Sequence, residues 1–120
     1  MGLGVATSLL AIAVAIGSVL ALRRKGRLPA LPVGAAHGAI GIAGLGVLIY
    51  LLPGSRRGEA TGSQSFGVIA AALIAAAAAV GLGMLAVHLR AHRLPGGLVG
   101  IHATLAVSGF VILVVYALLG

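Results

Sequence analysis

The stretch HLRAHRLPGGLVGIHATLAVSG, residues 88–109, places two histidines and two arginines before an apolar segment that contains a third histidine. An earlier stretch, RRKGRLPALPVGAAHGAIGIAG, residues 23–44, has the same order of basic residues, RLP, a histidine and small residues. Each stretch lies where one apolar run gives way to the next. The sequence therefore places a histidine at the same point of two apolar runs, close to basic residues.

Composition places the chain in a lipid bilayer. It has 120 residues, of which 61% are apolar and 8% charged, and a soluble domain of this size cannot cover so much apolar surface. Four continuous runs approach the ~20 residues that a hydrocarbon core requires, and these are Leu3–Leu22, Val33–Leu52, Phe66–Leu89 and Leu98–Leu119. Continuous rather than alternating apolar runs predict α-helices. We expect residues 1–120 to form a single all-α integral membrane domain, a four-transmembrane-helix up-down bundle.

Several classes of function are disfavoured by this composition. The chain contains no cysteine, which excludes disulfides, thiolate metal sites and thiol redox chemistry. Its one acidic residue, Glu59, falls in a polar loop, whereas a small multidrug-type transporter needs a carboxylate inside the membrane. The net charge of +7 comes from basic residues clustered at the ends of apolar runs. This placement favours contact with anionic lipid headgroups over binding of nucleic acid.

The distribution of basic residues predicts the orientation of the chain. The loops after the first and third runs hold six arginines and lysines, at positions 23, 24, 25, 27, 90 and 93, and the loop after the second run holds two, at 56 and 57. Because cytoplasmic loops carry the excess of basic residues, we expect both termini outside, in the periplasm, and the protein in a bacterial inner membrane. Tyr50 and Tyr116 fall near the outer ends of their runs, where aromatic belts form.

Matching residues indicate that a helix pair occurs twice. RLP occupies residues 27–29 and 93–95, which are 66 positions apart. At a spacing of 65, His37 matches His102 and Gly44 matches Gly109. We therefore expect a duplicated helix hairpin, in which the first and second helices correspond to the third and fourth. The histidines at positions 88 and 92 belong to one half only.

His37 and His102 are the candidate ligands of a flat cofactor. Each lies ~6 Å inside the predicted cytoplasmic start of its helix, and an up-down bundle places the second and fourth helices on a diagonal. The two rings can therefore face each other. The same helix faces continue with small residues that would leave room for a macrocycle, and these are Gly41, Gly44, Ala106 and Gly109. Two facing histidines above small residues are what a bis-histidine haem requires.

Basic residues lie at the same end of the expected bundle, where haem propionates would face the cytoplasm. Arginine pairs bidentately with carboxylates, so we expect Arg24, Arg90 and Arg93 as propionate partners. His88, at the cytoplasmic end of the third helix, has three open interpretations: an iron ligand, a propionate partner or an interfacial residue. His92 is expected in the interfacial loop.

Three features carry a resemblance: the segment AAHGAIGIAG (residues 35–44), the segment GIHATLAVSG (residues 100–109) and the basic loops. In these features the chain resembles small four-helix membrane cytochromes of cytochrome b561-like architecture. The resemblance implies a b-type haem held between histidines of different helices. Such cytochromes often bind two haems, but the outer half of this chain contains no histidine, which predicts one haem b. The expected role is electron transfer, with a membrane quinone or a redox partner subunit, rather than that of a stand-alone enzyme.

A second interpretation gives the histidines only a structural role. A membrane histidine can donate to a backbone carbonyl of a neighbouring helix, and small residues can serve close helix contact without any cofactor. The chain would then be a non-enzymatic accessory subunit of a larger membrane complex. A pigment-binding version is open as well, because histidine can ligate a chlorophyll-type magnesium. Homo-oligomers and hetero-oligomers are compatible with both interpretations.

Overall fold

A computed structural model describes residues 2–22 and 30–120, and within this part of the chain all regular structure is α-helical. The helices are α1 (Gly2–Leu22), α2 (Ala30–Leu51), α3 (Phe66–Ala91) and α4 (Gly96–Leu119). They contain 21, 22, 26 and 24 residues, so at about 1.5 Å per residue each is long enough to cross a ~30 Å hydrocarbon core. The predicted class, an all-α bundle of four membrane-spanning helices, is confirmed.

The helix ends differ from the predicted runs by up to three residues. α2 begins at Ala30 rather than Val33, so Pro32 lies in the first turn, where its missing N–H would have no partner within the helix. α4 begins directly after Pro95, whose backbone is extended (φ −64°, ψ 123°). α3 ends at Ala91, and the following residue, His92, adopts a left-handed conformation (φ 51°, ψ 32°), a common way to terminate a helix.

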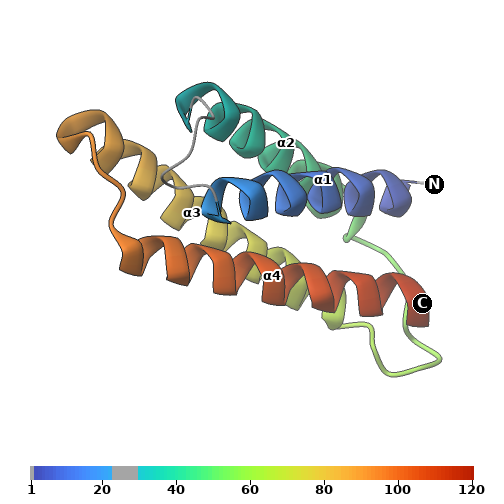
Figure 1. The fold of residues 1–120 in the computed structure, drawn as a ribbon. Helices are drawn as coiled ribbons and strands as arrows, with labels where there is room; N and C mark the ends of the chain where they lie inside the picture. Colours follow the sequence, from blue (N-terminus) through green and yellow to red (C-terminus); the bar gives the residue numbers. More distant parts are fainter. Residues whose placement is uncertain (1, 23–29) are drawn as a thin grey trace.

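The helices form an up-down bundle of two hairpins (Figure 1). α1 packs along α2, and α3 packs along α4, while α1 with α4 and α2 with α3 make the smaller contacts between the hairpins. α2 and α4 therefore occupy one diagonal, as predicted, and α1 and α3 occupy the other. The start of α1, the end of α4 and the segment 52–65 lie at one end of the bundle, which we call the terminal end. We call the opposite end, toward which the histidines lie, the histidine end.

The outer surface of the bundle is apolar on all four helices. Large exposed side chains occur on each of them, for example Ile12, Ile42, Leu82 and Val111. In water such a surface would promote association, whereas in a bilayer it contacts lipid tails that are equally apolar. Helix length, composition and this exposure together indicate an integral membrane protein.

The interior face repeats between the two hairpins. On α1 and α3 the matching positions are 64 residues apart, and the pairs are Ala6 and Ala70, Leu10 and Ile74, Ala13 and Ala77, and Gly17 and Gly81. On α2 and α4 they are 65 residues apart, and the pairs are His37 and His102, Gly41 and Ala106, Gly44 and Gly109, and Leu48 and Leu113. One constant spacing per helix pair relates the halves, as expected of a duplicated hairpin.

The two tyrosines lie in different environments. Tyr50 is 84% exposed at the terminal end of α2, as expected of a ring at the membrane interface. Tyr116 is only 3% exposed, and its hydroxyl lies 3.2 Å from Ser55 Oγ, within hydrogen-bonding distance. The prediction that Tyr116 also belongs to an aromatic belt is therefore wrong. At the spacing of 65 that relates α2 to α4, Tyr116 corresponds to Leu51 rather than to Tyr50.

The packed core occupies only the terminal half of the bundle. Its members come from all four helices and are Ala6, Leu10, Leu45, Leu48, Ala70, Ala71, Ile74, Leu113 and Tyr116. Among the residues that the structure describes, none is buried on the histidine side of Ala13 in α1, Gly44 in α2, Ala77 in α3 or Gly109 in α4. The half of the bundle that contains the histidines is therefore the more exposed half among the described residues.

The segment 52–65 folds against the C-terminal end of α4. Arg57 Nη1 donates to the Ala117 carbonyl at 3.0 Å, and Thr61 Oγ1 donates to the Leu119 carbonyl at 3.4 Å. These bonds satisfy carbonyls that have no partner within the helix. Ser63 is 2% exposed, with its hydroxyl 2.7 Å from Thr61 Oγ1. The segment is thus an ordered cover over this end of the bundle.

Candidate functional site

His37 of α2 and His102 of α4 meet across the diagonal of the bundle. Their ring centroids are 5.8 Å apart, and their planes make an angle of 76°. His37 lies seven residues beyond the start of α2 and His102 six beyond the start of α4, or ~10 Å along each helix. The two rings thus lie at the same depth. They are a few ångströms deeper than expected, because both helices begin before their predicted starts.

Each histidine is held by a backbone carbonyl of the preceding helix. The Nδ1 atom of His37 lies 2.7 Å from the Ala13 carbonyl oxygen, and the Nδ1 atom of His102 lies 2.7 Å from the Ala77 carbonyl oxygen. A carbonyl oxygen can only accept, so Nδ1 carries the proton in both rings. In the neutral ring this leaves a lone pair on Nε2. Histidines that ligate metals are commonly oriented by such a bond from the other ring nitrogen.

Two glycines outside the predicted set of site residues make room for these rings. A Cβ atom added at Gly17 of α1 would lie 2.7 Å from His37 Cε1, and one added at Gly81 of α3 would lie 3.2 Å from His102 Cε1. Each ring therefore packs directly on the backbone of its partner helix. A sequence signal for this role exists, because Ala-x-x-x-Gly occurs at residues 13–17 and again at 77–81.

The small residues that follow each histidine face the interior but pack within the hairpins. A Cβ atom added at Gly44 would lie 2.8 Å from Leu10 Cγ of α1, and one added at Gly109 would lie 2.7 Å from Ile74 Cγ1 of α3. Gly41 lies near Ala13 of α1, and the Ala106 position corresponds to it on α4. These residues permit close helix contact in each hairpin; their contact with a cofactor stays a prediction.

The remaining polar candidates lie toward the histidine end. Arg90, in the last turn of α3, and Arg93, in the segment between α3 and α4, are exposed. His88 is half-buried, and its Nδ1 atom is buried without a hydrogen-bond partner among the described residues. His92 is exposed at the C-terminus of α3, in agreement with its expected interfacial place. Arg24 lies outside the described residues.

The histidine pair offers two imidazole ligands in an apolar part of the bundle. Within residues 2–22 and 30–120 no three His, Cys, Asp or Glu side chains are grouped so that they could hold a metal ion. Two imidazoles suffice, however, for a metal whose other ligands come from a macrocycle. Metal–imidazole bonds are about 2 Å long, so two rings on opposite sides of one metal ion have centroids roughly 6 Å apart. The centroid distance of 5.8 Å at an interplanar angle of 76° is that of an edge-to-face ring contact, and it is also of the size that two imidazole ligands of one metal ion require.

Comparisons with known proteins add no assignment. No family model matches the chain, and no curated protein or solved structure matches it. The functional interpretation rests on the histidine pair and its surroundings.

Proposed function

We propose that the chain is a membrane b-type haem protein that carries electrons, with His37 and His102 as the axial ligands of one haem b. The observation that carries this proposal is the meeting of the two rings across the α2–α4 diagonal, with centroids 5.8 Å apart. Haem supplies a one-electron couple, and two imidazole ligands leave no open position for oxygen or a substrate. The proposed activity is therefore electron transfer.

The bonding of the two rings supports this assignment. Each Nδ1 atom is committed to a carbonyl, of Ala13 or Ala77, so both side chains can offer a neutral Nε2 to iron. The backbone bond also fixes the orientation of each ring, which lowers the cost of ordering it when a ligand binds. Two neutral ligands suit the apolar interior, where an unpaired charge would be costly.

The packing of the bundle supports it as well. A haem held by His37 and His102 would be bordered by the helices of the other diagonal, α1 and α3. At the level of the histidines these helices present Ala13, Gly17 and their counterparts in α3. Protein interiors are normally close-packed, and the described histidine half contains no fully buried residue. A large apolar cofactor would cover residues that the bundle itself leaves partly exposed in this half.

The polar residues at the histidine end suit the carboxylates of a haem. Arg90 and Arg93 can pair with propionates at the surface, and His88 can donate from its unpartnered Nδ1. Arg24 is proposed for the same role on the sequence alone. We place the histidine end on the cytoplasmic side of a bacterial inner membrane. A haem at this end would be positioned for electron exchange with a membrane quinone or a redox partner subunit.

A second candidate function is supported by the same hydrogen bonds. The carbonyls of Ala13 and Ala77 satisfy one nitrogen of each histidine, which is what a purely structural membrane histidine also does. In that case the chain is an accessory subunit, and the hydrogen bond of each histidine stabilises its own helix hairpin. The two candidates differ in one property: only the first requires a metal on Nε2.

The reduced-minus-oxidised absorption spectrum of the purified protein separates the two candidates. Expression with ample haem supply should give a red protein with the spectrum of low-spin b-type haem and one haem per chain. His37→Ala and His102→Ala should each abolish this spectrum, because each removes an axial ligand. Circular dichroism of the same samples would show that the helices remain.

His92→Gly is the matched control for the two ligand variants. It removes an exposed histidine at a left-handed backbone position (φ 51°), where glycine fits without strain, so haem content should not change. A colourless wild-type protein would refute the haem proposal and favour the accessory role. Loss of low-spin haem in His88→Ala, with retention in His37→Ala or His102→Ala, would show that the ligand pair is misassigned.

A further inference from the structure

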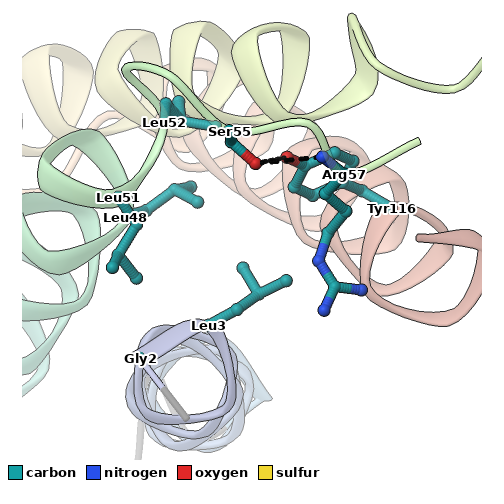
Figure 2. A pocket seen from close by; sticks show the side chains of 8 residues that line it. All are labelled: Gly2, Leu3, Leu48, Leu51, Leu52, Ser55, Arg57 and Tyr116. Atoms are coloured by element: carbon teal, nitrogen blue, oxygen red, sulfur yellow. Dashed lines mark hydrogen bonds between the residues drawn. The ribbon is translucent and has the colours of Figure 1, made fainter. Parts of the chain in front are cut away.

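A cavity lies at the terminal end of the bundle, remote from the histidines. It has a volume of about 210 Å³ and is bordered by the first residues of α1, the last turn of α2, the segment 52–65 and the end of α4 (Figure 2). Leu48 in its wall is eleven residues from His37 on the same helix, which corresponds to ~16 Å. The cavity is therefore separate from the proposed haem site.

Arg57 supplies a positive charge to this cavity. Figure 2 shows its guanidinium group extending from the loop into the space between Leu3 and α4. One of its five N–H groups is used by the bond from Nη1 to the Ala117 carbonyl. Glu59, the only acidic residue of the chain, accepts a bond from Gln64 instead. Glu59 is therefore not the partner of Arg57, whose side chain lies against Gly120.

Two hydroxyl groups and a set of leucines complete the lining. Ser55 Oγ lies 3.2 Å from the Tyr116 hydroxyl and accepts the backbone N–H of Arg57 at 3.3 Å, so the three polar residues hold each other in place. The remaining wall is apolar and is formed by Leu3, Leu48, Leu51 and Leu52 together with Gly2. The cavity therefore has a cationic, hydrogen-bonding part and an apolar part.

We propose that this cavity binds the phosphate headgroup of an anionic phospholipid. Guanidinium groups bind phosphate through paired, charge-assisted hydrogen bonds, and the leucine wall suits the start of the acyl chains. The cavity also lies at the right height, because the exposed Tyr50 places the interface at this end of the bundle. No acidic side chain lines it, so the cation of a zwitterionic headgroup would find no partner there. An anionic lipid is therefore preferred.

Native mass spectrometry of the full chain in detergent, with added phosphatidylglycerol, tests the proposal. Arg57→Gln should lower lipid retention about tenfold, as expected for the loss of a charged contact to phosphate. Arg56→Gln is the matched control, since it removes the same charge at the neighbouring position, which is exposed, and retention should be unchanged. Equal losses in both variants would show general attraction to a basic loop and overturn the site.

Two further measurements separate loss of lipid binding from loss of folding. Arg57→Gln also removes the bond to Ala117, so Leu3→Trp, which fills the cavity and leaves Arg57 in place, should lower retention as well; full retention would contradict the proposal. Phosphatidylcholine and inorganic phosphate should each raise the melting temperature of the wild type less than phosphatidylglycerol does. An equal rise with inorganic phosphate would identify a free anion as the ligand, and an equal rise with phosphatidylcholine would refute the preference for an anionic lipid.

Discussion

Ala13 and Ala77 each contribute one carbonyl oxygen to a histidine ring, and this bond alone does not define what the histidine does. A structural histidine and a ligating histidine both use it, because both must satisfy Nδ1 inside an apolar bundle. The difference lies in the environment of Nε2. In this bundle the two rings approach each other from diagonal helices, an arrangement that a purely structural role does not require.

At the scale of single residues, Gly17→Ala should be more harmful than Gly81→Ala. The added methyl group would lie 2.7 Å from His37 Cε1 in the first case and 3.2 Å from His102 Cε1 in the second. The first must displace the ring and its hydrogen bond, at a cost of about 1–3 kcal/mol, whereas the second needs only a small adjustment. Thermal unfolding in detergent and haem retention would measure both effects.

Gly34→Ala and Gly100→Ala are the controls for this pair, because a Cβ atom at either position meets nothing within 4 Å. Both should leave stability unchanged or raise it slightly, since alanine favours helix over glycine. Equal loss of haem in all four variants would show that the contacts of Gly17 and Gly81 with the rings are unimportant.

At the scale of helices, the glycines two turns beyond the histidines determine how closely each hairpin packs. Gly44 and Gly109 are both buried, whereas Gly46 on the same helix as Gly44 is exposed with open space around it. A side chain can move away from an added group more easily than the backbone can. A Cβ atom added at Gly109 would lie 3.2 Å from the Ala70 carbonyl oxygen as well as close to the Ile74 side chain. The α3–α4 hairpin is therefore the less tolerant of the two.

Gly44→Leu and Gly109→Leu should each force a hairpin apart and lower the melting temperature, with the larger drop for Gly109→Leu. Small-to-large changes in packed interiors typically cost about 1–3 kcal/mol. Gly46→Leu adds the same side chain to a lipid-facing position and should be neutral. A melting temperature for Gly109→Leu equal to that of Gly46→Leu would contradict the packing role.

At the scale of the whole molecule, the two ends of the bundle are built differently. The terminal half contains the leucine, isoleucine and alanine core and is covered by the segment 52–65. The described histidine half has no fully buried residue and carries the polar candidates His88, Arg90 and Arg93. This division suits a terminal half that stabilises the bundle and a histidine half that holds the proposed haem.

Cysteine labelling of the two ends would establish the orientation. Ser63 is buried and unsuitable for a label, so the exposed Ala60, at the terminal end, and the exposed Ala91, at the histidine end, are the better positions. We expect a membrane-impermeant maleimide to label Ala60→Cys on intact cells and Ala91→Cys only after permeabilisation, because basic loops remain in the cytoplasm. The opposite pattern would place the histidine end outside.

Much of the fold follows from sequence, because long apolar runs have few alternatives in a bilayer. The four helices, their up-down order and the diagonal position of α2 and α4 were predictable from run lengths and short loops. The pairing of His37 with His102 was accessible too, since the duplicated segments imply equal depth. The helix ends were less accurate, because prolines 32 and 95 are compatible with a helix start on either side of the predicted boundary.

The sequence by itself determined that this chain has four helices long and apolar enough to cross a membrane, with one histidine at the same depth in each half. Only the tertiary structure decided which carbonyls bind the histidine rings, why positions 17 and 81 are occupied by glycine, and why Tyr116 is buried while Tyr50 is exposed. The physical reason is that membrane helices are apolar on the side facing lipid as well as on the side facing protein. Hydrophobic periodicity therefore does not identify the interior face, which is set by the rotation of each helix against its neighbours.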